Sequence, residues 1–583
     1  MRDVPLGVAL VAVGLYFVGL GVAPFVDPPE GFHAEIARQM MLARDWATPR
    51  ANGVLYLDKP PLLYWLVSAS FTVAGVTQFA ARLAPALAVV ACAAVTARLG
   101  VLLGGPRLGL LAGLMAITNL GMFVYGRAAK PETLFVLWVT LAWTGFALAY
   151  VGDRRRGLAL FYAALGLAVL TKGLLSPLGP LLVVAAFFWL TRERPLGPWA
   201  PWWGVVLAGA IALPWYVVME VRRPGVLWYV LVDNSVHRLT RQRVFPGEDV
   251  ALGTVEFLVV TLLAFLPWAL ALPWAIARAL QRPWEDATAR LWFLVGLWSA
   301  AVLVFFTLVP FKLPHGALPA FPLFALLVAR AWDGAIEGEP GAPSPRALLV
   351  PVLGLFALVA GGFVAAWMGV PPLSVGVLSS LDTATRNLTE RGQPAPPLPL
   401  DAWAATVRSG AVIFALATVA MAVAVWRRSA ALGIGGALAT MIAFLPTVAA
   451  DGMTQFARVR SARPLAEALA QRARPGDLVV HEGAIENSAS ILLVVNGPLR
   501  VVNGLQSNLA FGATFPEARD IFWDSPQLEA AWSKPGRHFL ISAVDPARSV
   551  VRALPRASVH VIAHAGGRWL YSNLAERART VDD

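Results

Sequence analysis

Residues that could do chemistry gather in one stretch, from Pro24 to Trp65, which interrupts an apolar N-terminal region. It reads PFVDPPEGFHAEIARQMMLARDWATPRANGVLYLDKPPLLYW and mixes carboxylates with cations. Charges beside a membrane segment are costly unless they face water or a ligand. A polar loop between two helices also needs charges to stay in water, so the charges alone do not distinguish a solvated loop from a binding site. The ionisable residues include Asp27, Glu30, His33, Glu35, Arg38, Asp45, Arg50, Asp58 and Lys59.

The composition indicates what kind of protein must position these residues. The chain has 583 residues, 58% hydrophobic and only 14% charged, with a mean hydropathy of +0.65. Apolar runs of about 20 residues, enough to cross about 30 Å of hydrocarbon, recur from Leu6 to about Ala449. These values exclude a single soluble domain and predict a polytopic α-helical membrane protein.

We expect about thirteen membrane-spanning helices, oriented by the basic residues between them. With the N-terminus in the cytoplasm, clusters such as Arg154–Arg156 and Arg427–Arg428 fall on the cytoplasmic side. This holds only if the apolar segment 62–75 does not cross, so we expect it to be an interfacial or re-entrant helix packed against protein. The predicted spans are 6–24, 82–103, 107–125, 132–151, 157–172, 173–191, 201–219, 253–277, 290–309, 316–332, 347–369, 409–426 and 430–449.

The same arrangement collects the unusual polar residues on the outer face. The segments predicted there are the first loop, 126–132, 220–252, 310–315, 371–407 and everything after Ala450. The loop 220–252 alone carries five arginines and a histidine, which breaches the positive-inside pattern. A bound anion would explain the breach, and snorkelling of the cations to lipid headgroups is the alternative.

The end of the chain differs from the apolar part. We divide the chain into a transmembrane domain, 1–450, and an outer α/β domain, 451–583, because short apolar strands alternate with turns and one helical segment after Arg463. The expected strands are 478–480, 491–495, 499–502, 538–542 and 559–563. No phosphate-binding glycine loop is present in this part of the sequence, and nothing marks it as catalytic.

Two function classes are disfavoured by simple counts. The chain has one cysteine, Cys92, so a disulfide framework or a cysteine metal site is not available. The net charge of +12 would suit nucleic acid, but most arginines lie in short loops between apolar runs, where membrane topology explains them. We therefore expect no nucleic-acid partner.

Short motifs over about the first 330 residues carry a family resemblance. They include PEGFHAEIARQM and YLDKPPLLYW in the first loop, LTKG at 170–173, and KLPHGALPAFP at 312–322. In this order they resemble the bacterial lipid A aminoarabinose transferases and their relatives, including protein O-mannosyltransferases. The resemblance implies a GT-C fold with about thirteen spans, helices lying along the membrane and a soluble outer domain. It also implies a membrane glycosyltransferase that takes a sugar from a polyprenyl phosphate.

The resemblance implies a catalytic carboxylate but leaves its identity open. The family's loop begins with an Asp-Glu pair, and the corresponding positions here are Pro29 and Glu30. We expect Glu30 to act as the base, with Glu132 and Asp27 as the other candidates. Such a carboxylate would deprotonate or orient the acceptor hydroxyl, while cations would stabilise the departing lipid phosphate.

Further roles are assigned on the same basis. A divalent metal is left open, with Asp58 and His237 as its weak candidates. The expected donor-phosphate ligands are Lys59, Arg127, Arg238 and Lys312, and the expected substrate-binding residues are Glu35, Asp58, Lys130, Asn234, His237 and His315.

The predicted function is an inverting transfer from a polyprenyl phosphate sugar to a lipid, glycan or protein on the outer face of the bacterial inner membrane. The alternative is a transporter or flippase for a polyprenyl lipid or sugar. Transporters place their sites near the membrane midplane and often contain inverted repeats, but we find no convincing repeat between the two halves. The sequence names neither the sugar nor the acceptor.

Overall fold

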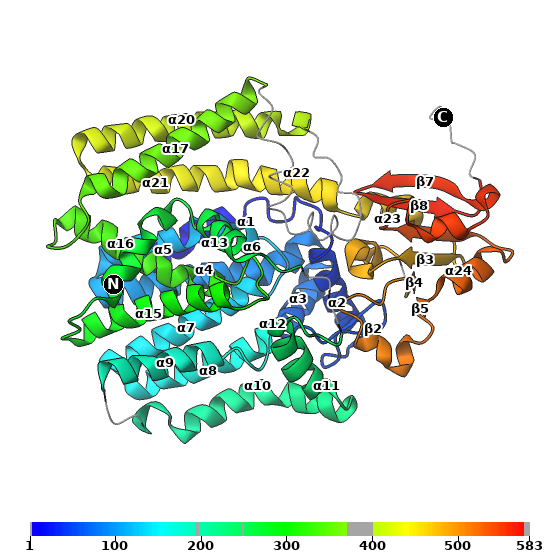
Figure 1. The fold of residues 1–583 in the computed structure, drawn as a ribbon, viewed down its shortest axis with the longest axis horizontal. Helices are drawn as coiled ribbons and strands as arrows, with labels where there is room; N and C mark the ends of the chain where they lie inside the picture. Colours follow the sequence, from blue (N-terminus) through cyan, green and yellow to red (C-terminus); the bar gives the residue numbers. More distant parts are fainter. Residues whose placement is uncertain are drawn as a thin grey trace.

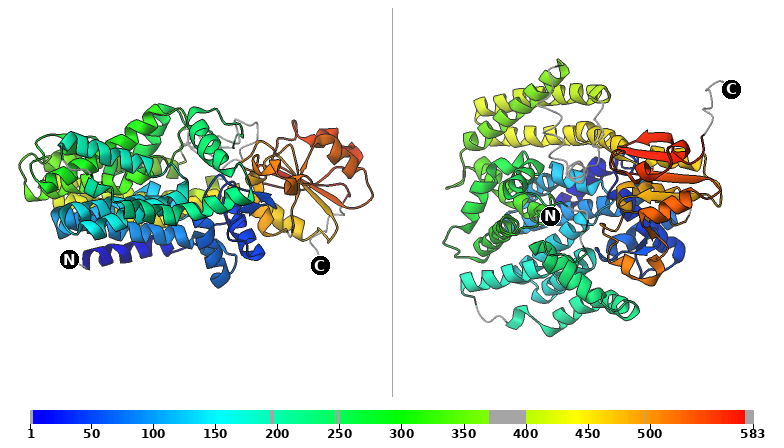
Figure 2. Two further views of the ribbon diagram at one scale, coloured as in Figure 1. Left: turned by 90° about the horizontal axis from the view of Figure 1, so that it is seen from below. Right: turned by 45° about the vertical axis from the view of Figure 1, so that its right-hand side comes forward.

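The computed structural model describes residues 3–193, 197–245, 247, 250–369, 400–495 and 497–575. Long apolar helices lie side by side and form a bundle, with the N-terminus at one end and a small sheet beyond the other end (Figure 1). A perpendicular view shows the same order from bundle to sheet (Figure 2). The helices of the bundle are α1 (Asp3–Phe17), α4 (Gln78–Gly104), α5 (Pro106–Ile117), α6 (Leu120–Gly126), α7 (Glu132–Val151), α8 (Arg154–Lys172), α9 (Leu178–Thr191), α10 (Trp202–Arg222), α13 (Thr254–Ala264), α14 (Leu272–Leu280), α15 (Ala287–Leu308), α16 (Phe321–Glu337), α17 (Pro345–Trp367), α20 (Ala404–Arg427) and α21 (Ala430–Phe444).

Every predicted span falls on one or more of these helices. Eight helical segments of the described chain are long and apolar enough to cross a membrane, or up to ten if each of two bent pairs forms one span. The other predicted spans lie on α1 and α9, which have 15 and 14 residues, and on α8, which begins with three arginines. The polytopic helical class is confirmed, and the count of about thirteen stays a prediction.

Two predicted spans, 107–125 and 253–277, are not continuous. The segment expected to cross at 253–277 is broken between α13 and α14, where the chain bends by 113°. Pro267 follows the end of α13, and a proline cannot donate the backbone hydrogen bond that would continue the helix. A second bend, of 62°, separates α5 from α6.

A layer of short elements lies between the bundle and the sheet (Figure 1). The segment predicted as an interfacial helix forms α3 (Leu62–Ala74), whose 13 residues span only about 20 Å at 1.5 Å per residue, less than a bilayer core. The other elements of this layer are α2 (Glu30–Ala43), β1 (Arg50–Ala51), β2 (Val54–Leu55), α11 (Val226–Trp228), the π-helix η2 (Tyr229–His237) and α12 (Arg238–Thr240). The predicted outer segment 371–407 lies outside the described residues up to position 399.

The C-terminal region is reached through a continuous helical path. The chain passes from α21 through η6 (Leu445–Ala449) into α22 (Ala450–Arg460), so no loop marks the predicted domain boundary at residue 450. The two-domain division of the chain stays a prediction. The elements that follow are α23 (Arg463–Ala470), β3 (Leu478–Glu482), η7 (Ile485–Leu493), β4 (Arg500–Val502), η8 (Gly512–Thr514), β5 (Phe522–Trp523), α24 (Ser525–Trp532), β6 (His538–Ser542), β7 (His560–Ala565) and β8 (Arg568–Ser572).

The sheet has the order β5-β4-β3-β6-β8-β7, in which β5, β4, β3 and β6 are parallel and β8 and β7 are antiparallel neighbours. The strand predicted at 491–495 is wrong. Residues 485–493 form the helical segment η7, which is buried against α2. A short apolar run does not distinguish a buried strand from a buried helical turn, and here the contact with α2 decides.

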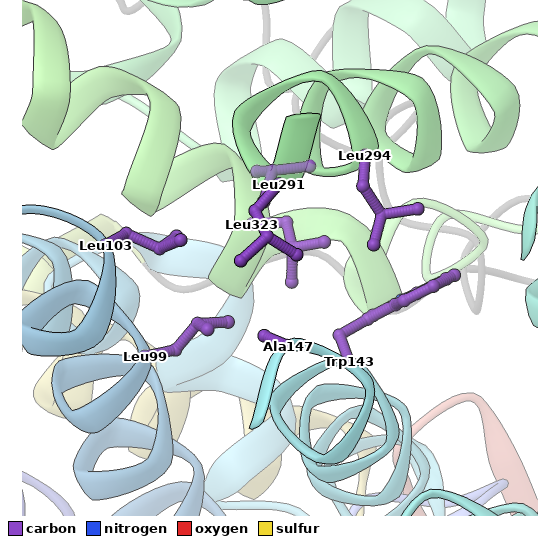
Figure 3. Close-up of a pocket in the computed structure, with 8 residues that line it drawn as sticks. Leu99, Leu103, Trp143, Ala147, Leu291, Leu294 and Leu323 are labelled. Atoms are coloured by element: carbon purple, nitrogen blue, oxygen red, sulfur yellow. The ribbon is translucent and has the colours of Figure 1, made fainter. Parts of the chain in front are cut away.

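The interior of the bundle is largely packed with apolar side chains. A cavity of about 10 Å³ lies between α4, α7, α15 and α16, lined by side chains such as Leu99, Trp143 and Leu323 (Figure 3). This volume is about the minimum that one water molecule requires, and the lining offers almost no polar partner. It is a packing defect, and the candidate functional site lies instead at the end of the bundle beside the sheet.

Candidate functional site

The first polar cluster is built around Glu132 at the start of α7. Lys172 Nζ donates to Glu132 Oε1 at 2.7 Å, and His315 Nε2 lies 3.6 Å from the same oxygen. The Glu132 side chain is 5% exposed. Its second oxygen, Oε2, is buried without a hydrogen-bond partner among the described residues. A buried carboxylate oxygen left unsatisfied is costly, so this atom is a natural place for a substrate hydroxyl to donate.

The helices α7 and α8 bring this pair together. They run antiparallel through a short turn, so the first residue of α7 and the last residue of α8 meet at one end. Gly157 lets them approach, since an added Cβ would lie 2.3 Å from the Ala149 backbone nitrogen. A carboxylate in the first turn and an ammonium in the last turn also complement the two helix dipoles.

His33 on α2 is a buried histidine whose pKa is influenced by the charges of this cluster. Its Nδ1 lies 2.9 Å from the Tyr64 hydroxyl. Burial lowers the pKa of His33 to about 3; Glu132 opposes the shift, and Lys130, Lys59 and Lys172 reinforce it. His33 is therefore neutral at physiological pH. The charges of Glu132 and of three lysines therefore all act on this buried position.

The second polar cluster is built around Asp58, which is buried at the end of the first loop. The Tyr229 hydroxyl donates to Asp58 Oδ1, and Arg243 Nη2 donates to the Tyr229 hydroxyl at 3.0 Å. Arg238 lies 3.8 Å from Asp58 Oδ2, and Arg243 lies 3.5 Å from Oδ1. Two guanidinium groups thus face the Asp58 carboxylate, and guanidinium groups are well suited to bind phosphate as well as carboxylate.

Neighbouring residues hold these arginines in place. Asn234 Nδ2 donates to the Asp58 carbonyl oxygen at 2.9 Å, while Arg238 Nη1 donates to Asn234 Oδ1 at 3.0 Å. Asp233 is fully buried and lies 3.4 Å from Arg243 Nε, and it also accepts from the backbone N–H of Val244 at 2.6 Å. The π-helix η2 carries Tyr229, Asp233 and Asn234, so one element supplies most of the support.

The two clusters adjoin one another. Burial, and then the charges of Asp58 and Glu132, raise the pKa of Tyr64 well above its usual value, although a hydrogen bond from Tyr56 opposes the shift. Tyr64 therefore lies close enough to both carboxylates for their charges to shift its pKa. Lys59 follows Asp58 directly, precedes α3, and acts electrostatically on His33. The expected donor-phosphate ligand Lys59 is thus next to the Asp58 cluster in the chain and is partly exposed.

Glu30 does not join either cluster. Arg82 donates to both of its carboxylate oxygens at 2.8 Å, and the backbone N–H groups of Ala129 and Val26 donate at 2.9 and 3.1 Å. Burial opposes ionisation, but Arg82 outweighs it and lowers the pKa of Glu30. With every acceptor position occupied, these contacts favour a structural role for Glu30 over the expected role as base.

The Asp27 carboxylate is also engaged by hydrogen bonds within the protein. Its carboxylate accepts from the backbone N–H of Ala462 at 2.9 Å and of Ser490 at 3.0 Å, and from the Ser490 hydroxyl. Gly31 is required beside it, since an added Cβ would lie 2.5 Å from Asp27 Oδ1. Asp27 therefore ties the first loop to the C-terminal region, which favours a structural role.

Three other predicted site residues are engaged elsewhere. Arg127 Nη1 donates to the carbonyl oxygens of Tyr16 and Val18 at 3.0 and 2.8 Å, which caps the end of α1. Lys312 Nζ donates to Thr254 Oγ1 at 2.6 Å. Glu35 pairs with Arg38 at 2.6 Å. Each is buried and bonded within the protein, which favours a structural role, and the roles expected for them from the sequence stay predictions.

The remaining predicted residues lie at the edges of the clusters. Lys130 Nζ lies over the ring of Tyr125 at 5.3 Å, and the ring of His315 packs edge-on against the same tyrosine. His237 Nδ1 lies 3.6 Å from Asp233 Oδ1. These positions suit contacts to a bound substrate at the rim.

A metal site is not evident in the part of the chain that the structure describes. No group of three or more His, Cys, Asp or Glu side chains there is placed to hold an ion. The weak candidate Asp58 instead accepts from Tyr229 and faces two guanidinium groups, surroundings that disfavour a cation.

Several residues of the two clusters were not predicted from the sequence as site residues. Lys172 had a signal, because it lies in the quoted LTKG motif at the end of an apolar helix. Arg243 was visible only as one of several outer arginines. No sequence pattern indicated a role for Tyr229, since a tyrosine in an apolar run is usually interpreted as a core residue.

Comparison with known proteins adds an independent line of evidence. Residues 14–230 match the family model "Dolichyl-phosphate-mannose-protein mannosyltransferase". The chain is 31% identical over 359 residues to the undecaprenyl phosphate-alpha-4-amino-4-deoxy-L-arabinose arabinosyl transferase of Aeromonas salmonicida, covering 59% of this chain and 62% of that one. For the Pseudomonas aeruginosa PAO1 protein of the same name, identity is 29% over 428 residues, covering 71% and 75%. The alignments thus span only about three fifths of the length of the first curated relatives.

Solved structures match over nearly the whole chain. ArnT from Cupriavidus metallidurans bound to undecaprenyl phosphate superposes with a TM-score of 0.79 at 25% identity, covering 98% of both chains. The Archaeoglobus fulgidus oligosaccharyltransferase, at 12% identity and a TM-score of 0.50, shares the fold over 93% of this chain and 69% of its own. The resemblance predicted from the motifs is confirmed, and the chain has the GT-C fold seen in ArnT.

Proposed function

We propose that this protein is an inverting membrane glycosyltransferase that moves a sugar from a polyprenyl phosphate to a hydroxyl of a lipid, glycan or protein. One observation carries the proposal: a buried carboxylate, Glu132, is held on one oxygen by Lys172 and His315 and keeps its other oxygen without a hydrogen-bond partner among the described residues. The relatives' names support the donor class, since they specify transfer from undecaprenyl phosphate. The transporter alternative gains no support from the relatives.

The reaction assigns a task to each half of the site. The acceptor oxygen attacks the anomeric carbon, the bond from that carbon to the phosphate oxygen breaks, and configuration inverts. The acceptor proton passes towards Glu132, whose Oε2 orients the hydroxyl before attack. The lipid phosphate leaves with one more negative charge than it carried in the donor. Cations placed where this charge develops lower the barrier.

We assign the phosphate to the space between the clusters. Lys59 is partly exposed just before α3, and Arg238 and Arg243 both face the Asp58 carboxylate next to it in the chain. Such cations are worth more in a water-poor site than in bulk water. Lys172 and His315 set the position of Glu132, while Lys130 and Asn234 lie at the rim for contacts to sugar or acceptor.

The test uses purified protein in detergent or vesicles with undecaprenyl phosphate-linked sugars, starting with 4-amino-4-deoxy-L-arabinose because the relatives are named for it. We expect release of undecaprenyl phosphate that depends on an acceptor. Mass spectrometry of envelope lipids and proteins with and without the gene identifies which molecule gains the sugar. An unchanged envelope together with no turnover of any such donor would refute the proposed function.

The chain is a multi-pass membrane protein. We further propose that it lies in the bacterial inner membrane with the site and the C-terminal region on the outer side. Support comes from the clusters of arginine at the opposite end of the bundle, such as Arg154–Arg156 in the first turn of α8.

Cysteine labelling tests this orientation. Cys92 is buried, so the native background is low. A cysteine at Thr454 is expected to react with an impermeant reagent in intact spheroplasts, and one at Arg155 only after permeabilisation. The reverse pattern would overturn the whole orientation.

A further inference from the structure

A loop of the C-terminal region reaches the Asp58 cluster. Phe511, in the segment that follows β4, lies flat on the ring of Tyr229, with ring centroids 4.1 Å apart and an interplanar angle of 7°. Phe245 and Phe515 pack edge-on against Phe511, with centroids 5.3 and 5.4 Å away. Among the described residues, Phe511 is the only buried member of this apolar cluster that comes from the region after residue 450.

The loop is seated at two further points. Gly512 lies so close to β2 that an added Cβ would be 2.0 Å from the Leu55 carbonyl oxygen. Glu517 lies 2.7 Å from Arg223 at the end of α10 and 3.5 Å from Arg50 in β1. Contacts of the residues that follow Phe511 along the chain therefore also hold this loop against the first loop and α10.

Tyr229 transmits this position to the charged groups. Its hydroxyl donates to Asp58 and accepts from Arg243 Nη2 at 3.0 Å. The tyrosine ring is almost completely buried, so any shift of the stacked ring moves the hydroxyl within the cluster. Offset-stacked and edge-on aromatic pairs are mutually attractive beyond the burial of their area, so Phe511 favours one position of the Tyr229 ring.

We propose that Phe511 is a positioning residue of the donor site: it fixes Tyr229, and through Tyr229 the arrangement of Asp58, Arg243 and Arg238. This inference rests on the proposed function, because it assigns those arginines to the phosphate of the donor. It gives the C-terminal region a part in donor binding, although no catalytic group of this proposal lies in it. Phe511 acts through Tyr229 and touches no reacting atom.

The experiment compares Phe511→Ala and Phe511→Leu with Phe511→Tyr. Loss of the ring is expected to raise the donor KM about five- to tenfold with kcat within about twofold, whereas Phe511→Tyr, which keeps the flat ring, stays near wild type. Phe511→Leu removes the ring but keeps most of the apolar volume. The prediction can therefore still be tested with this variant if Phe511→Ala fails to fold. In a double-mutant cycle, Phe511→Leu is expected to add little to Tyr229→Leu.

A matched control separates positioning from general destabilisation. Leu528 is fully buried in a separate apolar cluster of the C-terminal region that includes Trp532 and Leu540. Leu528→Ala is expected to lower thermal stability while leaving the donor KM unchanged. Equal rises of KM in Leu528→Ala and Phe511→Leu, or a wild-type KM in both Phe511→Ala and Phe511→Leu, would overturn the positioning role.

A second readout distinguishes failure of this inference from failure of the proposed function. Undecaprenyl phosphate itself is the probe, and its affinity is measured from the thermal shift of each variant. Wild-type protein should bind it, Lys59→Ala and Phe511→Leu should bind it more weakly, and Leu528→Ala should bind as wild type does. If Lys59→Ala weakens binding and Phe511→Leu does not, the inference fails and the proposed function stands. If the wild type binds no probe and turns over no donor, the proposed function fails, and the inference with it.

Discussion

Glu132→Gln is expected to lower kcat by about two to four orders of magnitude with donor binding largely intact. The substitution keeps the shape of the side chain and removes its negative charge and its capacity to take a proton. Lys172 can still donate to the amide oxygen, so the pair with α8 survives in part. The measurement is single-turnover transfer with saturating donor, accompanied by the affinity for undecaprenyl phosphate.

The control for this variant is Glu30→Gln, which the sequence alone suggested as the inactivating change. The buried carboxylate of Glu30 satisfies Arg82, and breaking a buried ion pair costs about 3–5 kcal/mol. We therefore expect a large fall in thermal stability and a smaller fall in kcat for the molecules that remain folded. If Glu30→Gln is stable and inactive while Glu132→Gln turns over normally, the base is Glu30. If Asp27→Asn alone is inactive with unchanged stability, the base is Asp27.

Lys59→Ala is expected to raise the donor KM tenfold or more, which corresponds to about 1.4 kcal/mol or greater. Lys59 is partly exposed beside the Asp58 cluster, so its loss removes an attraction for phosphate without emptying a packed core. The measurement is initial rate against donor concentration at saturating acceptor. Normal turnover at subsaturating donor would contradict the assignment.

Lys312→Met is the matched control for this prediction. Both lysines were expected to bind phosphate, but Lys312 is buried and donates to Thr254 and to the Thr307 carbonyl oxygen. Its replacement is expected to lower stability by leaving buried oxygens without a donor, while the donor KM of the folded protein stays within about twofold. A tenfold rise of KM in both variants with equal loss of stability would show that Lys59 acts through the fold.

The C-terminal region is coupled to the first loop by charged and polar contacts as well as by Phe511. Asp27 accepts from Ala462 and Ser490, and Asn52 exchanges two hydrogen bonds with the backbone of Leu499, at 2.9 and 2.7 Å. All these partners are buried, so the contacts are protected from competition with water. The first loop is therefore ordered from both sides, by the bundle and by the sheet region.

Much of the architecture could be predicted from the sequence because its cause is local. A run of about 20 apolar residues is sufficient reason for a membrane helix, and the charges at the ends of such runs indicate an orientation. The short helix α3 was predictable in the same way, since Leu62–Ala74 is too short to cross and a crossing there would invert all later loops. Lys59 and Asp58 drew attention because charged residues beside an apolar segment need a reason.

The role of each charged residue was decided only by the tertiary structure, because a carboxylate's chemistry depends on what occupies its oxygens. Glu30 and Glu132 look equivalent in sequence, each acidic at the start of a helix. Arg82 lies far along the chain from Glu30, and folding places it on both oxygens of that carboxylate, whereas Glu132 meets only Lys172 and His315 on one oxygen. No local pattern encodes that difference. It arises from which distant cation the packing of helices brings within reach, and from which buried oxygen it leaves for a substrate.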